Sequence, residues 1–381
     1  MTDRPRIYLD HAATGWPKSP AVAQAMTHVI DNVGAAAGRG VYDSAIESTR
    51  IVNKLRGQLA NLIGAESSDC ITLHCSGTAA LNAGLLGLVR PGDHVVTTAS
   101  EHNSVLRPLN HLRTTAGVQL DIVPPASDAR HDAASILDRV RPDTAAVVVT
   151  GASNVTGIAM PIAEIAASLT DHPAMLIVDA AQTFGWLPID VRVGIDVLAA
   201  PGHKAAGGPL GTGFLYVAPA LHQAIRPTIF GGTGSSSESV EMPTAMPDKL
   251  ESGNLNVPAI AGWSAGLPNT DHINRRLTLA GELSEKLHNA LERSGCHKTP
   301  IGDLPIVSFW SDDLDAAELA ILLSTEFGIE VRSGHHCAAR IVQTLGGPPS
   351  GVARASAGPE TTDAEIAALS QAITEILAPP P

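Results

Sequence analysis

The sequence has few aromatic residues, few cysteines and no excess of basic residues. Aromatic side chains make up 3% of the 381 residues, and the four cysteines form no Cys-x-x-Cys pair. This usage speaks against a disulfide framework and favours a reduced, cytoplasmic protein. The 25 basic residues face 38 acidic ones, which gives a net charge of −13. Nucleic acids and anionic membranes need a basic patch, so we expect neither as a partner.

Long apolar runs are also missing. No stretch approaches the roughly 20 apolar residues that span a bilayer, and the basic N-terminus leads into no apolar signal core. The chain is nevertheless 44% hydrophobic, which is ample for a large core. Its length suggests two domains. We expect a large domain over 14–265 and a small domain formed by 1–13 and 266–381.

Short apolar runs alternate with helical patterns over the first two thirds of the chain. We expect strands at 71–74, 93–98, 120–123, 145–150, 175–179, 197–200 and 213–217. Strands that are apolar on both faces and alternate with helices indicate an α/β fold with a mostly parallel sheet. Ligands of such sheets bind at the carboxyl ends of the strands. The second region alternates again, with strands near 306–310 and 329–332, and indicates a smaller α+β unit.

The stretch Gly202-His203-Lys204 follows an apolar run that ends in a Pro-Gly turn. An ammonium beside a buried strand must be solvated, paired or consumed in a covalent bond. Taken alone, an exposed loop lysine is the simpler interpretation. Asp179 ends the preceding apolar run, although it could also be a turn or cap residue. Lysine and aspartate at two strand ends suit pyridoxal 5′-phosphate (PLP), as Schiff-base partner and as partner of the ring nitrogen.

Other polar residues stand at the same predicted sheet edge. The turn Gly77-Thr78-Ala79 lies between a strand and a helix, where free N–H groups can hold a phosphate. Glycine-rich turns before helices are common, so this signal is moderate. His102 follows another strand and could stack on the PLP ring, although a lone histidine is more often structural. Asn154 follows the strand at 145–150.

A second group of reactive side chains lies at Arg332 to Cys337. Adjacent residues such as His336 and Cys337 cannot easily converge on one tetrahedral ion, so we expect no metal site. A buried structural cysteine is possible. A nucleophile is the sharper interpretation, because a thiolate is favoured near basic groups. Arg354, in a strand-like segment, could bind a substrate carboxylate with two hydrogen bonds, or form a surface ion pair.

With both regions in view, the chain resembles the class V aminotransferase family. It is most similar to the cysteine desulfurase and selenocysteine lyase branch, in the SufS-like (group II) form. The resemblance covers nearly the whole chain and rests on Tyr8-Leu9-Asp10, Gly77-Thr78, Glu101-His102, Ser153-Asn154, Asp179 through Gln182, Gly202-His203-Lys204, Glu251-Ser252-Gly253, Arg332 through Cys337, and Arg354-Ala355-Ser356.

The resemblance implies PLP fold type I, as in aspartate aminotransferase, and conversion of L-cysteine to L-alanine. Lys204 would hold PLP and move a substrate proton, and Cys337 would accept the sulfur as a persulfide. The implied cofactor residues are Gly77, Thr78, Ala79, His102, Asn154, Asp179, Gln182, His203, Lys204 and Asn254. The implied substrate residues are Asn154, Arg332, Arg354 and Arg39.

The resemblance further implies a homodimer, in which Arg39 and Asn254 reach the partner's site, and a sulfur-acceptor protein. The chain departs from the family pattern at Ala79 and Pro201, where hydroxyl residues are usual, and each loss removes a phosphate donor worth ~1 kcal/mol. Asn254 replaces a threonine. The segment 357–361 replaces a usual Tyr-Asn-Thr sequence. A selenocysteine lyase, a sulfinate desulfinase, an epimerase or a transaminase stays an alternative, as does a scaffold that has lost catalysis.

Overall fold

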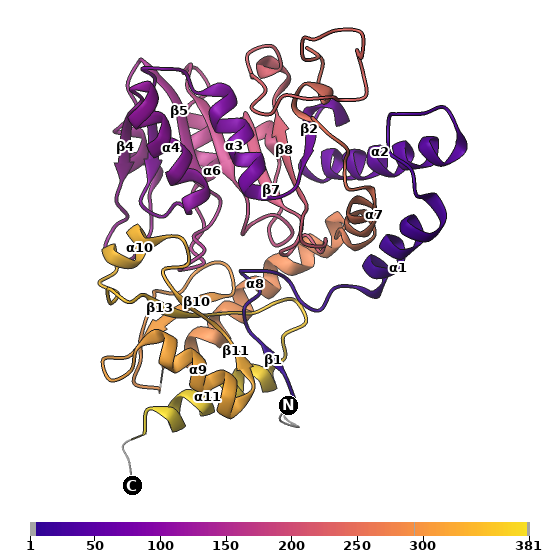
Figure 1. The fold of residues 1–381 in the computed structure, drawn as a ribbon. Coiled ribbons are helices and arrows are strands. Elements are labelled where there is room, and N and C mark those ends of the chain that lie inside the picture. Colours follow the sequence, from indigo (N-terminus) through magenta and orange to yellow (C-terminus); the bar gives the residue numbers. More distant parts are fainter. Residues whose placement is uncertain (1–4, 293, 379–381) are drawn as a thin grey trace.

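The computed structural model describes residues 5–292 and 294–378. Figure 1 shows two bodies, an upper one around a large sheet and a lower one around smaller sheets. The large sheet has seven strands in the order β2-β8-β7-β6-β5-β3-β4. Their bounds are β2 Ile71–His74, β3 His94–Thr98, β4 Gln119–Val123, β5 Thr144–Thr150, β6 Met175–Asp179, β7 Val197–Pro201 and β8 Gly213–Val217. All run parallel except β8, which pairs antiparallel with β2 and β7. The predicted mostly parallel seven-stranded sheet is confirmed.

Helices cover both faces of the large sheet, which explains why its strands are apolar throughout. One face packs against α3 (Gly77–Leu88) and α4 (Asn103–Ala116). The other face packs against α2 (Asp43–Ile63), α5 (Ala133–Leu137), α6 (Ile162–Ser168) and α7 (Val257–Gly266). Within β5, Ala146 and Val148 join the first cluster, and Val147 and Val149 join the second. Outside these layers, α1 (Pro20–His28) packs on α7.

The lower body combines both ends of the chain. Its antiparallel sheet has the order β12-β13-β10-β9, with bounds β9 His297–Lys298, β10 Ile306–Trp310, β12 Arg332–Gly334 and β13 Val352–Ser356. Near the N-terminus, β1 (Ile7–Tyr8) pairs in parallel with β11 (Ile329–Glu330). Leu9 and Ala12 join the apolar core of this body. The helices are α8 Thr270–Ala290, α9 Ala316–Phe327, α10 Ala339–Thr344 and α11 Asp363–Ile376.

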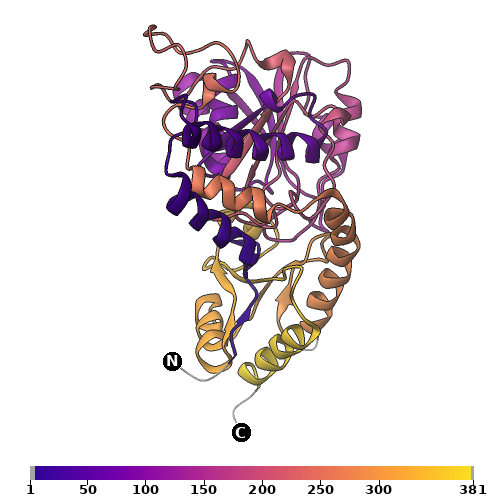
Figure 2. The same cartoon turned by 90° about the vertical axis from the view of Figure 1, so that its right-hand side faces the viewer.

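The long helix α8 connects the two bodies. It runs down one side of the lower body, as Figure 2 shows, and its residue Arg276 lines a cavity together with Lys204. Within the lower body it packs against α11 and β10. None of the helices in the described ranges is long and apolar enough to cross a membrane.

Local differences from the predicted elements have simple causes. The segment 132–141 is helical only over the five residues of α5, which Asp132 caps, and a turn follows at Asp138. The first helix continues from His28 into a π-helical turn at Val29–Val33, which Gly34 ends in the left-handed conformation. The strand expected at 329–332 is divided at Val331, since β11 and β12 pair in different sheets.

Candidate active site

Five strand ends of the large sheet and two strands of the lower body, β12 and β13, line a cavity of about 200 Å³. β2, β3, β5, β6 and β7 all end here, so the polar residues that follow them converge as expected. The predicted site residues that line it are Gly77, Thr78, His102, Asn154, Asp179, Gln182, His203, Lys204, Arg332 and Arg354. Residues far apart in the sequence thus share one site at the sheet edge.

Glycine packing fixes the turn that carries Lys204. A Cβ on Gly202 would lie 2.3 Å from the Thr212 hydroxyl and 2.8 Å from the Trp263 ring. The Gly202 N–H donates to the Thr212 carbonyl at 2.9 Å and ties the turn to the next strand. Burial lowers the pKa of Lys204 to about 8, with Asp179 acting in the opposite direction. At pH 7 about one tenth of this amine is therefore uncharged, far more than for an ordinary lysine.

Asp179 is the last residue of β6 and is 2% exposed. Its Oδ1 accepts the Ala181 N–H at 2.9 Å. Burial raises the pKa of this carboxyl, whereas the hydrogen bond and the positive charge of Lys204 lower it. A carboxylate buried in this way needs a cationic partner to stay ionised. Lys204 is one such partner, and the protonated ring nitrogen of a bound PLP would be another.

His102 is fixed as one tautomer. Its Nδ1 accepts the Ser104 backbone N–H at 3.0 Å, so a neutral ring carries its proton on Nε2. Burial, with Lys204 the next cause, lowers the pKa of His102 to about 4. The Ser104 hydroxyl lies 2.8 Å from Nδ1 and 2.7 Å from the Thr78 hydroxyl, which links the ring to α3. His102 is therefore a neutral ring with a fixed orientation at neutral pH.

The N-terminus of α3 faces the same cavity. Ser76 caps this helix by accepting the Ala79 N–H at 3.0 Å, while the N–H groups of Gly77 and Thr78 donate to no acceptor in the described ranges. A Cβ on Gly77 would lie 2.9 Å from the Pro201 ring, so only glycine fits there. Free N–H groups at a helix start, with the positive end of the helix dipole, suit a phosphate.

Arg354 lies on the opposite wall and is 1% exposed. Its Nη2 donates to Asp10 Oδ1 at 2.7 Å, and its Nη1 donates to the Asn154 carbonyl at 3.0 Å. Burial lowers the pKa of Arg354, and Asp10 raises it. Arg354 Nε and Asn154 Oδ1 are buried without a partner in the described structure. This wall retains unused hydrogen-bonding capacity for a polar ligand.

The loop of Cys337 is bound to both walls. Asn154 Nδ2 donates to the His336 carbonyl at 2.8 Å, and the Asn103 N–H donates to the Cys337 carbonyl at 2.7 Å. His336 and Cys337 have φ values of 50° and 58°, which non-glycine residues rarely adopt. His336 lines the cavity, and the half-exposed Cys337 follows it at the edge without being part of the lining. The loop thus holds the Cys337 backbone in a strained conformation beside Asn103 and Asn154.

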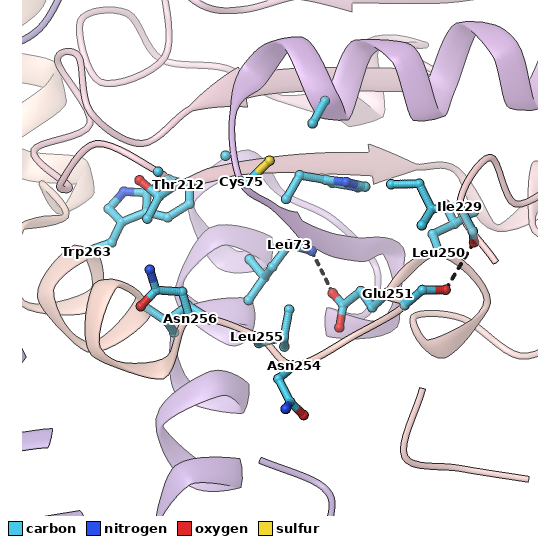
Figure 3. Close-up of a pocket in the computed structure, with 16 residues that line it drawn as sticks. Leu73, Cys75, Thr212, Ile229, Leu250, Glu251, Asn254, Leu255, Asn256 and Trp263 are labelled. Atoms are coloured by element: carbon cyan, nitrogen blue, oxygen red, sulfur yellow. Dashed lines mark hydrogen bonds between the residues drawn. The ribbon is translucent and has the colours of Figure 1, made fainter. Parts of the chain in front are cut away.

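Besides Cys337, three predicted residues lie outside the lining of the Lys204 cavity. Ala79 and Asn254 line a neighbouring pocket, shown in Figure 3, where the Asn254 side chain points away from the others. Glu251 holds the loop before Asn254 by accepting the Leu73 N–H at 2.6 Å. Arg39 is exposed and donates to the Gly232 and Gly253 carbonyls. Among the described residues, no group of three His, Cys, Asp or Glu side chains could hold a metal ion.

Glu101, Ser104 and Asp10 support the site from behind and were not predicted as site residues, although Glu101 and Asp10 lie in the motifs that carry the resemblance. Glu101 is fully buried, and its Oε1 accepts the Thr98 hydroxyl at 2.7 Å and the Thr150 N–H at 2.9 Å. Burial raises the pKa of Glu101 to about 8. The sequence contained a signal for Glu101, because an acidic residue shortly after an apolar strand has little access to solvent. Asp10 gave no such signal, because its partner Arg354 is 344 residues away in the sequence. Ser104 gave none either, because its hydroxyl contacts Thr78, 26 residues away, as well as the nearby His102.

Comparisons with known proteins agree with this geometry. The family model for Aminotransferase class-V matches residues 7–369. A probable cysteine desulfurase of Methanothermobacter thermautotrophicus is 34% identical, over 98% of this chain and 95% of the relative. A cysteine desulfurase of Yersinia pestis is 28% identical, over 89% of this chain and 86% of the relative.

Solved structures show the same architecture. The apo cysteine desulfurase of Thermococcus onnurineus NA1 superposes with a TM-score of 0.89 at 27% identity, over 98% of this chain and 94% of that one. The cysteine desulfurase CsdA of Escherichia coli, in an S-sulfonic acid form, gives 0.87 at 26% identity with the same coverage. The predicted fold type I architecture is confirmed, and the chain belongs to the class V aminotransferase family.

Proposed function

We propose that the chain is a PLP-dependent cysteine desulfurase, which converts L-cysteine to L-alanine and retains the sulfur as a persulfide on Cys337. The observation that carries this proposal is that Lys204 with Asp179, and the loop of Cys337, meet at one site. Lys204 and Asp179 line the cavity, and the Cys337 loop is hydrogen-bonded to Asn103 and Asn154 at its edge. The names of relatives and structural neighbours support the same reaction.

The residues present fit PLP. The free N–H groups of Gly77 and Thr78, together with His203, whose Nδ1 is buried without a partner, would hold the phosphate. Asp179 would pair with the ring nitrogen, Gln182 would contact the phenolic oxygen, and His102 would stack on the ring. Bound PLP supplies an electron sink that stabilises negative charge on the substrate carbon. Ala79 and Pro201 supply no hydroxyl group, so this phosphate site would depend on backbone donors and His203.

Lys204 is suited to hold the cofactor and to move the substrate Cα proton. Its pKa of about 8 means that the amine exchanges protons readily near neutral pH. The opposite wall would bind the substrate carboxylate through Arg354, whose Nε has no partner in the described structure, and through the second N–H of Asn154 Nδ2, whose first N–H donates to the His336 carbonyl. Arg332, more exposed on the same wall, adds positive charge.

Cys337 would attack the substrate sulfur as a thiolate. The new S–S bond forms as the substrate C–S bond breaks, and the electron pair of that bond stays on carbon, which then takes up a proton to give alanine. His102, with its proton on Nε2, is placed to supply or relay protons at this site. The thiol, and not the histidines beside it, is the group that changes oxidation state.

The proposal extends to assembly and organisation. We place the domain division at 14–265 for the PLP domain and 1–13 with 266–381 for the domain that carries the cysteine loop. Two observations support it: β1 pairs with β11, and the apolar cores of the two bodies are separate clusters.

We further propose a cytoplasmic homodimer of the SufS-like subgroup, with Arg39 and Asn254 directed at the partner's site and an acceptor protein for the sulfur. Arg39 and Asn254 lie outside the cavity of their own chain, as this arrangement needs.

The test is alanine release from L-cysteine by the purified, PLP-loaded protein with a thiol reductant. We expect equal amounts of alanine and sulfide over many turnovers, and none of either with Cys337→Ala, which should keep the visible absorbance of bound PLP. If Cys337→Ala still releases alanine from cysteine, the role of this thiol is wrong. If the wild-type protein binds no PLP, the proposal as a whole fails.

A further inference from the structure

Arg276 lies on α8 but makes its hydrogen bonds far from that helix. Its Nη1 donates to the Gly185 carbonyl and to the Ala205 carbonyl, both at 2.8 Å. Gly185 belongs to the turn that follows Asp179, and Ala205 follows Lys204 directly. One guanidinium nitrogen therefore bridges the two turns that carry the carboxylate and the amine of the site.

The two turns also touch each other at this point. Gly185 has a φ of 93°, and a Cβ there would lie 2.5 to 2.7 Å from backbone atoms of Ala205 and Ala206. The backbones are in direct contact, so any shift of one turn changes the position of the other. Neither the Gly185 nor the Ala205 carbonyl accepts another hydrogen bond from the described residues. Arg276 is the group that holds this contact together from the side of the lower body.

The other side of Lys204 is held differently. The His203 carbonyl accepts hydrogen bonds from the Thr14 hydroxyl, the Gly15 N–H and the Lys18 ammonium. This carbonyl has three donors, and loss of one leaves two. The Ala205 carbonyl has one donor, and loss of Arg276 leaves it empty.

We propose that Arg276 is a positioning residue, which sets Lys204 relative to Asp179 by bridging the Gly185 and Ala205 carbonyls. The role rests on the proposed function, because it matters for a cofactor held by Lys204. This role also makes α8 a direct link between the lower body and Lys204. Figure 2 shows α8 as a single helix that runs between the two bodies.

The chemistry of the bridge favours arginine. The two N–H bonds of one planar nitrogen diverge, so each can point to a different carbonyl. No carboxylate in the described ranges forms an ion pair with Arg276, and burial lowers its pKa while Glu360 raises it. Glu360 lies in the segment 357–361 that departs from the family pattern and lines the same cavity as Lys18, Lys204 and Arg276. The charge of Arg276 is thus used mainly on backbone carbonyls.

The experiment compares Arg276→Met and Arg276→Lys with Arg275→Met, which removes an exposed neighbouring arginine on the same helix. Two readouts are needed in the full-length chain. The first is hydrogen exchange of the Gly207 and Gly208 amides in the PLP-free protein, which reports the Lys204 turn without any cofactor. The second is the PLP dissociation constant, together with the visible circular dichroism per molecule of bound PLP.

We expect Arg276→Met to speed exchange at Gly207 and Gly208 and to weaken PLP binding by about tenfold or more, as the loss of hydrogen bonds from a charged donor implies. The circular dichroism of bound PLP should fall, Arg276→Lys should restore part of it, and Arg275→Met should change nothing. If Arg276→Met lowers only the melting temperature and leaves exchange and circular dichroism unchanged, the residue is merely structural and the inference is wrong. Wild-type protein that binds no PLP would refute the proposed function, while the exchange readout would still decide the bridge.

Discussion

The turn that carries Lys204 and the turn that carries Cys337 hold their reactive side chains in opposite ways. Around Lys204, glycines stand where a side chain would clash, as at Gly202 and Gly185, and the carbonyls of His203, Lys204 and Ala205 all accept hydrogen bonds. Around Cys337, two non-glycine residues accept a left-handed backbone that costs each about 1 kcal/mol or more. The comparison indicates that the lysine is built for a fixed position, and that the thiol is presented at the expense of stability.

The largest expected effect comes from disturbing the contact behind Lys204. Gly185→Ala combines a φ of 93° with a Cβ 2.5 Å from the Ala205 backbone, and should destabilise the protein by more than about 3 kcal/mol. The matched control is Gly211→Ala, which has a similar φ of 83° and nothing within 4 Å of the new Cβ. It should cost about 1 kcal/mol. Equal losses for the two variants in urea unfolding would show that the contact is unimportant.

The next effect concerns the charge of Lys204. Because burial lowers its pKa from 10.5 to about 8, the uncharged amine should fall tenfold for each pH unit below that value. Capture of PLP by the cofactor-free protein, trapped with borohydride, should therefore be about 50-fold faster at pH 8 than at pH 6 and rise only about twofold more above pH 8. Lys204→Arg is the control and should trap nothing at this site. A rate that keeps rising to pH 10 would contradict the lowered pKa.

A smaller effect is expected from the wall next to the cysteine loop. Asp10→Asn leaves the buried Arg354 without its carboxylate partner, which accepts at 2.7 Å, and should cost about 2 kcal/mol. Glu330→Gln breaks an exposed pair with Arg6 of the same length and should cost less than about 1 kcal/mol. Chemical unfolding of both variants checks this order, and the reverse order would refute the importance we give to the buried pair.

The smallest effect isolates the strain at the thiol. Cys337→Gly and Cys337→Ala both remove the sulfur, but only glycine tolerates a φ of 58° without cost. The glycine variant should be more stable than the alanine variant by about 1 kcal/mol, and both should lack sulfur transfer. Thermal unfolding of the two proteins measures the difference. An alanine variant that is as stable as the glycine variant would mean that the loop is relaxed.

The same contrast explains what the sequence could predict. Strands such as 213–217 and 306–310 were predicted with their observed bounds, because short apolar runs indicate buried strands whatever their tertiary contacts are. The residues of the Lys204 turn were predictable because they follow such strands. Arg276 was not, because on an amphipathic helix it looks like any solvated arginine, and its partners are 71 and 91 residues away. The backbone strain at Cys337 could not be predicted either, because a non-glycine residue gives no local sign in the sequence that its φ is positive.

The most direct test of the central claim is the mass of the peptide that contains Cys337 after the PLP-loaded protein reacts with L-cysteine in the absence of a reductant. The account predicts one added sulfur atom on Cys337, with one alanine released per site, and no added sulfur on Cys70, Cys75 or Cys296. Alanine release with the sulfur on another cysteine, or with no sulfur retained on the protein, would contradict it.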